Sequence, residues 1–343
     1  MIICNGLGNK TKEGVKMKQA VGVGAALMDL VTTVSEEWIV RQKKPKGGMN
    51  PVSWGEMGRI LGNVERLTTI PGGSASNTII GLARLGGLAR FVCKVGNDDL
   101  GDVYSQNLFR SGVEGYIRKS ATPTGRVLSA VTPDAQRTMY TYLGASAEMV
   151  PTEISDVPFH NAHVLYLEGY LAYAPTILLQ CVNAAKANDL EVVFDCGSFG
   201  VIQERRFILD ELIGEGDIDI LIANEDEAKI LTNVEEELAC MEMAKMAKIA
   251  IVKIGKKGSI ICTKDEIFRI NAVEAKALDT TGAGDLWASG FLYGYLNDWP
   301  LDKCGELASA VASEVIQIMG PVIPDTGYEK LIKIRDKIAE SLK

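Results

Sequence analysis

The sequence predicts an α/β fold with one doubly wound, mainly parallel β-sheet flanked by helices, and a small β-sheet that acts as a lid. After residue 151, short apolar runs typical of buried strands alternate with segments of helical spacing. This alternation indicates βαβ units in a parallel sheet. Two segments, near 35–70 and 113–145, are instead rich in turn residues or in Thr, Val and Tyr. We expect these two insertions to pair into the lid.

The first part of the chain leads into the large sheet. The apolar run Val21–Ala26 predicts a buried strand that ends at Asp29. Ser74 is suited to cap a helix that Gly86 and Gly87 end. The pattern then predicts a strand at 91–95, a helix at 100–111, and a hairpin of 124–132 with 138–143.

The second part of the chain has the most regular pattern. We expect strands at 164–167, 191–194, 218–222 and 249–254, and helices at 176–187, 204–213, 225–231 and 235–248. An antiparallel pair of strands at one edge of the sheet is predicted at 259–262 and 267–270. Three terminal helices are predicted at 284–296, 303–319 and 328–342.

The 343 residues have room for one large domain or two average ones. We predict one domain over 19–343 after a flexible extension at 1–18, because periodic structure begins only at Ala20. The 36 basic and 44 acidic residues give a net charge of −8, which offers no positive field to a nucleic acid. Since the sequence shows neither a membrane span nor a secretory leader, we expect a cytoplasmic protein without a membrane partner.

Several common chemistries are excluded or disfavoured by the residues present. Only two histidines occur, which disfavours a Ser-His-Asp hydrolase. The seven cysteines include no C-x-x-C pair, which disfavours a zinc ribbon. No P-loop motif occurs, and the Gly22-Val23-Gly24 segment lacks the third glycine of a dinucleotide fingerprint, since Leu27 stands there.

The strongest local motif is the segment Asp279-Thr280-Thr281-Gly282-Ala283-Gly284-Asp285, which runs directly into an apolar helix. Glycines before a helix allow a tight turn whose N–H groups, together with the helix dipole, form an anion hole suited to a phosphate. Asp285 places a carboxylate beside that hole, where it can take a proton from an attacking hydroxyl. The alternative is that Asp285 only stabilises the helix start.

Two further motifs precede this one in the chain. Pro71-Gly72-Gly73-Ser74-Ala75-Ser76-Asn77 contains a glycine pair that lets a ligand approach the backbone, and its Asn77 can donate to and accept from a hydroxyl. Asn224-Glu225-Asp226-Glu227 stands between a predicted strand and helix. Its side chains can order Mg²⁺ through water, or they can simply cap the helix.

Together, these three motifs resemble the ribokinase-like, PfkB-type carbohydrate and nucleoside kinases, in the family's order, and the resemblance covers about residues 20–325. Within that family the chain is most similar to adenosine kinases. This finer resemblance is carried by the segments 71–77, 137–147, 166–170 and 221–225. It implies a ribokinase-like fold and transfer of the γ-phosphate of ATP to an alcohol group.

The resemblance implies a role for individual residues of the acceptor site. Asp285 would be the general base, and the N–H groups of Gly282, Ala283 and Gly284 would stabilise charge on the transferred phosphoryl group. The residues implied to bind the acceptor are Asp29, Gly72, Gly73, Asn77, Glu168 and Arg137. Arg137 would reach the phosphate from the lid, or it would be an ordinary exposed arginine of a strand.

The resemblance also implies where ATP and metal ions bind. Asn224, Lys253, Gly255 and Gly258 would contact ATP, although Lys253 stands where relatives commonly have Thr. Asn224 and Glu227 would hold Mg²⁺ through water, and Asp279 with Thr281 is a candidate site for a monovalent cation such as K⁺.

Three functions remain open from the sequence. The leading one is an ATP-dependent nucleoside kinase that converts adenosine to AMP. The alternatives are a PfkB-type sugar kinase acting on ribose, fructose or a keto-acid sugar, and a non-catalytic nucleoside-binding protein of the same fold. Trp38, Trp54 and Tyr140 lie in the lid segments, where they would stack on a base or pack within the lid. The sequence is compatible with a monomer or a homodimer.

Overall fold

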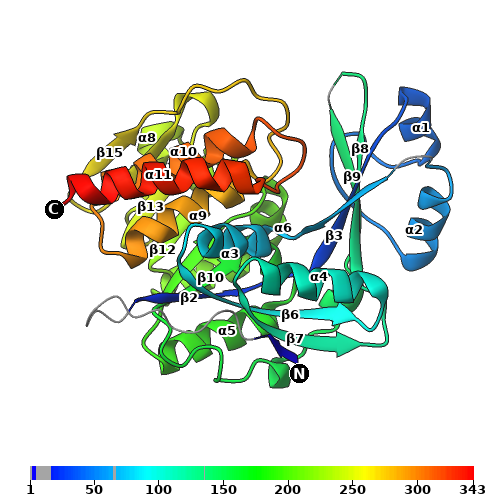
Figure 1. The fold of residues 1–343 in the computed structure, drawn as a ribbon, viewed down its shortest axis with the longest axis horizontal. Helices are drawn as coiled ribbons and strands as arrows, with labels where there is room; N and C mark the ends of the chain where they lie inside the picture. The colour runs from blue at the N-terminus through cyan, green and yellow to red at the C-terminus, as the bar shows by residue number, and fades with distance from the viewer. Residues whose placement is uncertain (1, 5–16, 65–66, 135) are drawn as a thin grey trace.

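The computed structural model describes residues 2–4, 17–64, 67–134 and 136–343, and the fold is built around two β-sheets (Figure 1). The larger sheet has ten strands. In spatial order they are β1 (Ile2–Cys4), β7 (Glu114–Ser120), β6 (Leu88–Gly96), β2 (Gln19–Val23), β10 (Val164–Glu168), β11 (Glu191–Asp195), β12 (Ile220–Asn224), β13 (Ile249–Lys253), β14 (Ser259–Cys262) and β15 (Ile267–Ile270). All pairings from β7 to β13 are parallel, and those at the two edges are antiparallel.

Helices cover both faces of this sheet because its strands are apolar on both sides. One face packs against α5 (Pro175–Ala187), α6 (Phe199–Gly214), α7 (Glu225–Thr232) and α8 (Glu236–Met243). The other face packs against α3 (Ser74–Arg84), α4 (Asp99–Arg110), α9 (Ala283–Leu296) and α10 (Leu301–Val315), and α11 (Asp325–Ser341) packs on α10. The predicted α/β fold class is confirmed.

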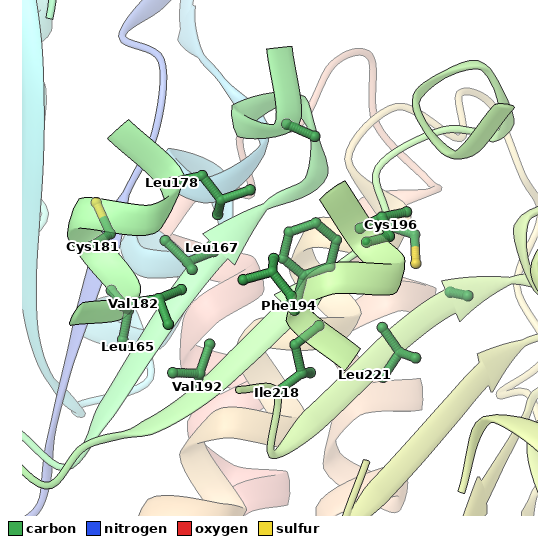
Figure 2. Packing of buried hydrophobic residues seen from close by; sticks show 14 of the residues in the cluster. Leu165, Leu167, Leu178, Cys181, Val182, Val192, Phe194, Cys196, Ile218 and Leu221 are labelled. Atoms are coloured by element: carbon green, nitrogen blue, oxygen red, sulfur yellow. The ribbon is translucent and has the colours of Figure 1, made fainter. Parts of the chain in front are cut away.

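Alternate residues of each parallel strand enter opposite cores. Figure 2 shows Leu165 and Leu167 of β10 beside Phe194 of β11, all within the core that includes Leu178 of α5. The intervening Tyr166 belongs to the core on the other face. This alternation follows from the two-residue period of a strand.

The order of the strands defines where a ligand is expected. From β2 the chain adds β6 and β7 on one side, and it then returns to place β10 on the other side of β2. In open α/β sheets, ligands bind beyond the carboxyl ends of the strands at this reversal of direction. The ends of β2 and β10 therefore mark the expected site.

The smaller sheet has five strands and projects to one side of the large one (Figure 1). In spatial order they are β4 (Gly48–Pro51), β9 (Arg137–Tyr142), β8 (Gly125–Val131), β3 (Leu27–Thr33) and β5 (Thr68–Gly72). One of its faces is covered by α1 (Glu36–Arg41) and α2 (Trp54–Leu61), with Leu30, Leu128 and Tyr140 buried between them. The opposite face, which carries Asp29, Val127 and Thr141, lines a cavity described below.

The aromatic residues of this region pack within it. Trp38 contacts the edge of the Tyr140 ring at a centroid distance of 5.9 Å, and Tyr140 is fully buried. Trp54 lies 5.1 Å from Tyr142, at the helix-covered face. Of the two roles considered for Trp38, Trp54 and Tyr140, stacking on a base or packing within the lid, the structure shows packing.

The expected boundaries of the two insertions need correction. The first expected segment started near residue 35, but the small sheet already begins at Leu27, because β3 pairs with β5 and β8. The second started near 113, but β7 pairs with β6 in the large sheet. The strand predicted at Val21–Ala26 corresponds to β2, which already ends at Val23. Asp29 lies inside β3 rather than at the end of the first strand.

The expected N-terminal extension differs in part. Ile2–Cys4 forms β1, which pairs with β7, and residues 1 and 5–16 lie outside the described part of the chain. The connections include four short 3₁₀ helices, η1 (Gly144–Glu148), η2 (Pro151–Glu153), η3 (Gly169–Tyr173) and η4 (Gly255–Lys257). None of the described helices is long and apolar enough to cross a lipid bilayer.

Candidate active site

A cavity of about 340 Å³ lies between the small sheet and the carboxyl ends of β2 and β10. Part of its wall is polar and includes residues that the sequence predicted for the site: Asp29, Gly73, Asn77, Glu168, Thr281, Gly282 and Asp285. The remaining wall is mainly apolar and includes Leu27, Met49, Val127, Met139, Leu143, Met149, Leu171 and Ile177. The structure therefore joins the first and last sequence motifs in one cavity at the expected edge of the sheet.

Asp285 lies in the first turn of α9, where two polar side chains hold its carboxylate. The Ser74 hydroxyl donates to Oδ1 at 2.8 Å, and the Asn77 amide donates to Oδ2 at 2.9 Å. Ser74 was expected to cap α3, but the N-cap residue is Gly73, with φ of 100°, and makes no side-chain cap. The Ser74 side chain instead orients Asp285, which the local sequence did not reveal.

Burial raises the pKa of Asp285, and the nearby carboxylate of Asp195 raises it further. The hydrogen bonds from Asn77 and Ser74 and the charge of Lys253 act in the opposite direction without cancelling the rise. A raised pKa makes the carboxylate a stronger base, which suits proton abstraction from a hydroxyl. The geometry thus supports more than helix stabilisation for Asp285.

Asp29 faces the same cavity from the small sheet. Its Oδ2 lies 2.3 Å from the point where a Cβ on Gly72 would stand, so a larger residue at position 72 would displace the Asp29 carboxylate. No hydrogen bond joins the Asp29 carboxylate to another group in the described part of the chain, so its lone pairs are available to a ligand. Burial, followed by the charge of Asp285, raises the pKa of Asp29 to about 7, although Arg137 acts to lower it.

Glu168 lies at the end of β10, and backbone N–H groups occupy both of its oxygens. Oε1 accepts from Ala25 at 2.9 Å, and Oε2 accepts from Ala75 at 2.8 Å. Burial raises the pKa of this carboxyl to about 7. Glu168 ties the turn after β2 to the start of α3, and its direct contact with a substrate stays a prediction.

The N–H groups at the start of α9 are not all available for an anion. The Ala283 N–H donates to Thr280 O at 3.2 Å, which differs from the expected role in an anion hole. By contrast, the backbone N–H groups of Gly282 and Gly284 donate to no acceptor among the described residues. Gly282 takes the left-handed φ of 73° that the turn requires.

Lys253 reaches the same helix start from the end of β13. Its Nζ lies 3.0 Å from where a Cβ on Gly284 would stand and 2.9 Å from Asp195 Oδ2. Burial acts to lower the pKa of Lys253, but the charges of Asp195 and Glu227 outweigh it and keep the pKa raised. Lys253 therefore carries a positive charge beside the loop, and Asp195 is a site residue that no sequence motif indicated.

Asn224 and Glu227 form a capping box at the start of α7. The Glu227 oxygens accept from the backbone N–H of Asn224 at 2.8 Å and from its side-chain amide at 2.7 Å. Burial raises the pKa of Glu227 to about 7. No group of three potential metal ligands among His, Cys, Asp and Glu occurs in the described residues. Each Glu227 oxygen keeps a lone pair, which suits contact with Mg²⁺ through water.

The other predicted ATP residues lie outside the cavity wall. Gly255 begins η4, and Gly258 is the residue that caps its carboxyl end. A Cβ on Gly258 would stand 1.9 Å from Ile270 O, and its φ is 102°, so packing against β15 requires glycine there. Both lie just beyond Lys253 at the carboxyl edge of the sheet, and their contact with ATP stays a prediction.

Arg137 and Asp279 meet across the two sheets. The Arg137 Nη2 donates to Asp279 Oδ1 at 2.6 Å. Asp279 also accepts from the Thr281 hydroxyl at 2.7 Å and from the Gly320 N–H at 2.8 Å. Arg137 is thus neither an ordinary exposed arginine nor a free one: it is paired with the loop that leads into α9.

The family of pfkB carbohydrate kinases matches residues 53–326, a range that contains most of the predicted site. The chain belongs to this family. It is therefore a phosphotransferase that acts on a hydroxyl group of a sugar or a nucleoside, and its fold is ribokinase-like.

Relatives of both acceptor classes are found in this family. The chain is 30% identical to the 5-dehydro-2-deoxygluconokinase of Geobacillus kaustophilus over 279 residues, covering 76% of this chain and 83% of the relative. It is also 30% identical to the nucleoside kinase of Methanothermobacter thermautotrophicus over 272 residues, covering 77% and 84%. The adenosine kinase of Sinorhizobium meliloti has a similar structure, with a TM-score of 0.84, 31% identity and coverage of 92% and 99%.

Proposed function

We propose that this PfkB-family kinase transfers the γ-phosphate of ATP to the primary hydroxyl of a nucleoside, with adenosine to AMP as the leading reaction. The observation that carries the proposal is the composition of the cavity. Its lining includes the carboxyl groups of Asp29 and Asp285, and most of the remaining lining residues are apolar. A nucleoside has the matching division between a ribose with hydroxyls and a flat, weakly polar base.

The apolar wall argues for a base on the acceptor. Met49 and Met139 of the small sheet and Ile177 of α5 all line the cavity. A bare sugar would place hydroxyl groups against these side chains without hydrogen-bond partners, which is unfavourable. Flexible methionines adapt well to a planar ring. The pocket thus favours a nucleoside over ribose or fructose.

The charges of the wall argue against an acidic acceptor. Three carboxyl groups line the cavity, those of Asp29, Glu168 and Asp285, and its lining in the described residues contains no Lys, Arg or His. Where these carboxyl groups are ionised, they would repel an acceptor that carries a carboxylate, and the lining offers it no cationic side chain. This disfavours the keto-acid sugar among the alternatives.

In the proposed mechanism, Asp285 removes the proton of the acceptor hydroxyl as its oxygen attacks the γ-phosphorus. Ser74 and Asn77 hold the carboxylate in place. The bond to the β-phosphate oxygen breaks, and ADP leaves. The N–H groups of Gly282 and Gly284 and the charge of Lys253 stabilise the transferred group.

The remaining residues would serve ATP and exclude water. Mg²⁺ bound with ATP would neutralise phosphate charge, and Asn224 and Glu227 would contact it through water. Asp29 would accept hydrogen bonds from two vicinal hydroxyls of ribose. The small sheet would act as a lid whose closure protects ATP from hydrolysis.

The test is a panel of acceptors with ATP and Mg²⁺, in which phosphorylated product is measured for adenosine, guanosine, ribose, fructose and 5-dehydro-2-deoxygluconate. We expect adenosine to have the highest kcat/KM. Turnover of the acid or of a bare sugar, without turnover of adenosine, would contradict the proposal. The Asp285→Asn variant, assayed in parallel, shows any background turnover from a contaminating kinase.

Binding of adenosine, measured by calorimetry, separates the kinase from a non-catalytic binder. Tight binding without turnover of any acceptor would support the binder. Since Asp285 is held by two side chains beside unpaired N–H groups, we expect both binding and turnover.

A further inference from the structure

Two charged side chains meet at the carboxyl edge of the large sheet. Asp195 is the last residue of β11, and Lys253 is the last residue of β13. Strand β12 lies between them, so their backbones are two strand spacings apart, about 10 Å. Val193 and Ile251, two residues earlier in each strand, belong to the core that packs against α9. Since side chains alternate along a strand, Asp195 and Lys253 point to that same face.

The two side chains form a shielded ion pair. Lys253 Nζ lies 2.9 Å from Asp195 Oδ2, and the side chains are 16% and 5% exposed. The carboxylate has further partners, because Oδ2 accepts from the Tyr166 hydroxyl and Oδ1 accepts from the Gly197 N–H, both at 3.3 Å. These contacts fix its orientation. Asp195 therefore offers the flexible lysine a partner whose own position is set by the sheet.

The ammonium of Lys253 keeps donors for a ligand. It carries three N–H groups, and Asp195 is its only hydrogen-bond partner in the described part of the chain. Its Nζ lies 3.0 Å from where a Cβ on Gly284 would stand, at the first turn of α9. The N–H groups at the start of a helix attract negative charge, as an ammonium does. Two N–H groups of Lys253 are thus available to an anion at this point.

The position of Lys253 indicates which substrate that anion belongs to. Neither Lys253 nor Gly284 is part of the cavity wall, whereas Asp285, the next residue of the helix, is. The acceptor in the cavity therefore meets Asp285, and Lys253 serves a ligand outside the cavity. In the proposed reaction that ligand is the triphosphate of ATP, because its γ-phosphorus must stand beside the hydroxyl that Asp285 deprotonates.

We propose that Asp195 is a positioning residue of phosphoryl transfer. Its carboxylate holds the ammonium of Lys253 against the start of α9, where the two remaining N–H groups contact the phosphates of ATP. The proposal rests on the phosphoryl transfer proposed above and extends it to a residue outside the three sequence motifs. Asp195 acts through Lys253 and does not itself contact either substrate.

The first test is a double-mutant cycle of Asp195→Leu and Lys253→Met, read by kcat. Each single change should lower kcat by about tenfold or more, since a charge that stabilises the transferred group is lost or displaced. The double variant should match Lys253→Met within about threefold, because Asp195 has no effect once the lysine is absent. A folded Asp195→Leu with a smaller loss, or a double variant that falls further below Lys253→Met, would overturn the proposal.

The double variant also protects this test against misfolding. Removing one partner of a buried pair leaves an uncompensated charge, whereas apolar replacement of both partners is often neutral or stabilising. If Asp195→Leu does not fold, the comparison of the double variant with Lys253→Met still decides whether Asp195 acts only through the lysine.

The second test separates positioning from a merely structural role. Calorimetry with Mg²⁺ measures the dissociation constants of adenosine and of the ATP analogue AMP-PNP. In the three variants we expect weaker binding of AMP-PNP, by about tenfold or more, because a contact between the lysine and a phosphate is lost. Adenosine binding should stay within about threefold, because the described cavity wall contains neither residue of the pair. Equal weakening of both ligands would show that the pair only supports the fold.

The matched control is Glu114→Gln, which breaks another shielded ion pair of the large sheet. Glu114 Oε2 lies 2.9 Å from Arg90 Nε, and the Arg90 side chain is 16% exposed, as is that of Lys253. This pair joins the amino-terminal parts of β6 and β7. We expect wild-type kcat and wild-type binding of both ligands. A loss of AMP-PNP binding as large as in Asp195→Leu would contradict a specific role for Asp195.

Failure of the proposed function has a different signature. If another acceptor is phosphorylated in place of adenosine, that acceptor replaces adenosine in both tests. If the wild type phosphorylates no acceptor, the proposed function fails, and the binding of AMP-PNP to the same variants still decides the role of Asp195.

Discussion

At the scale of single residues, the most informative feature is the support given to Asp285. Ser74 and Asn77 occupy one oxygen each, so the carboxylate is fixed before any substrate arrives. Preorganisation of this kind lowers the cost of reaching a productive geometry. It also means that Asp285, the proposed general base, can be replaced by an isosteric amide without removing the groups around it.

We predict that Asp285→Asn lowers kcat by about 10²–10⁴-fold, which is the range expected for loss of a general base. The dissociation constant for adenosine should stay within a few-fold of wild type, because the binding wall is intact. Rapid-quench turnover and calorimetric titration check the two parts. A variant with near-normal kcat would remove Asp285 from the proposed mechanism.

The carboxyl groups of the site also predict a dependence on pH. The pKa of Asp29 is raised to about 7 by burial and by the charge of Asp285, and burial raises the pKa of Asp285 itself. Both groups must be ionised to act as proposed. We expect log(kcat/KM) for adenosine to rise with pH up to about 7 and then to level off. The Asp29→Asn variant should change the rising part of this pH profile.

Stability should change in the opposite direction over the same range. Between the ordinary pKa of Asp29 and its folded value of about 7, the folded state binds more protons than the unfolded state. The free energy of unfolding therefore falls as pH rises through this window. Urea unfolding at pH 5 and pH 8 measures the wild type, and Asp29→Asn should show the smaller difference. An equal or larger difference in the variant would contradict the cause assigned to Asp29.

From the sequence, residues of the cavity wall were predictable where they stand in a local motif, and their functional roles stay predictions. Asp285, Gly282 and Asn77 were found because each stands in a compact segment with its own backbone requirement. Ser74 was interpreted as a helix cap because its partner is 211 positions away. Asp195 was missed for the same reason, since its contact with Lys253 spans 58 positions.

At the scale of elements, the turn into α3 depends on one glycine. Gly73 has φ of 100°, and a Cβ there would stand 2.3 Å from the carbonyl oxygen of Ala25. Since the backbone on both sides faces the cavity, neither segment can move without changing the site. The glycine is therefore required by geometry as well as by access of a ligand.

We predict that Gly73→Ala lowers the free energy of unfolding by about 1–3 kcal/mol, the usual cost of such backbone strain. The matched control is Gly58→Ala in α2, where a Cβ would meet nothing within 4 Å. That change should stabilise the protein by up to about 1 kcal/mol, because alanine favours a helix. Urea unfolding of both variants measures the difference, and equal stabilities would contradict the strain argument.

Elements were predictable where local periodicity determines them. The alternation after residue 151 indicated β10 to β15 and the helices between them, because fully apolar strands and amphipathic helices have distinct patterns. Which sheet a strand joins is not a local property. β3 follows β2 after only three residues and still enters the small sheet, whereas β7 lies within the segment 113–145 expected for the small sheet and joins the large one.

At the scale of the whole molecule, the site exists because two sheets meet. The large sheet supplies the carboxyl ends of β2 and β10 and the start of α9, and the small sheet supplies Asp29 and Arg137. The negative net charge of the chain is no obstacle to a phosphate site, since backbone N–H groups and Lys253 provide a local positive potential.

The same arrangement predicts the oligomeric state. An uncovered small sheet would expose an apolar face and favour association through it. Here that face is covered by α1 and α2, which bury Ile39, Met57 and Ile60 against Leu128 and Tyr140. The opposite face lines the cavity and is unavailable as an interface if substrates are to enter. We therefore predict a monomer.

Light scattering coupled to size exclusion checks this at protein concentrations of about 1–100 μM, a range wide enough to reveal a dimer held by an interface of standard size. The expected mass is that of one chain, 37.0 kDa. A constant mass of two chains would mean that another surface associates. The Met57→Ala variant provides a comparison, because it leaves a cavity under α2 and loosens the packing of this helix on the small sheet. If α2 is what keeps the apolar face of the sheet from a second molecule, the variant should associate more than the wild type.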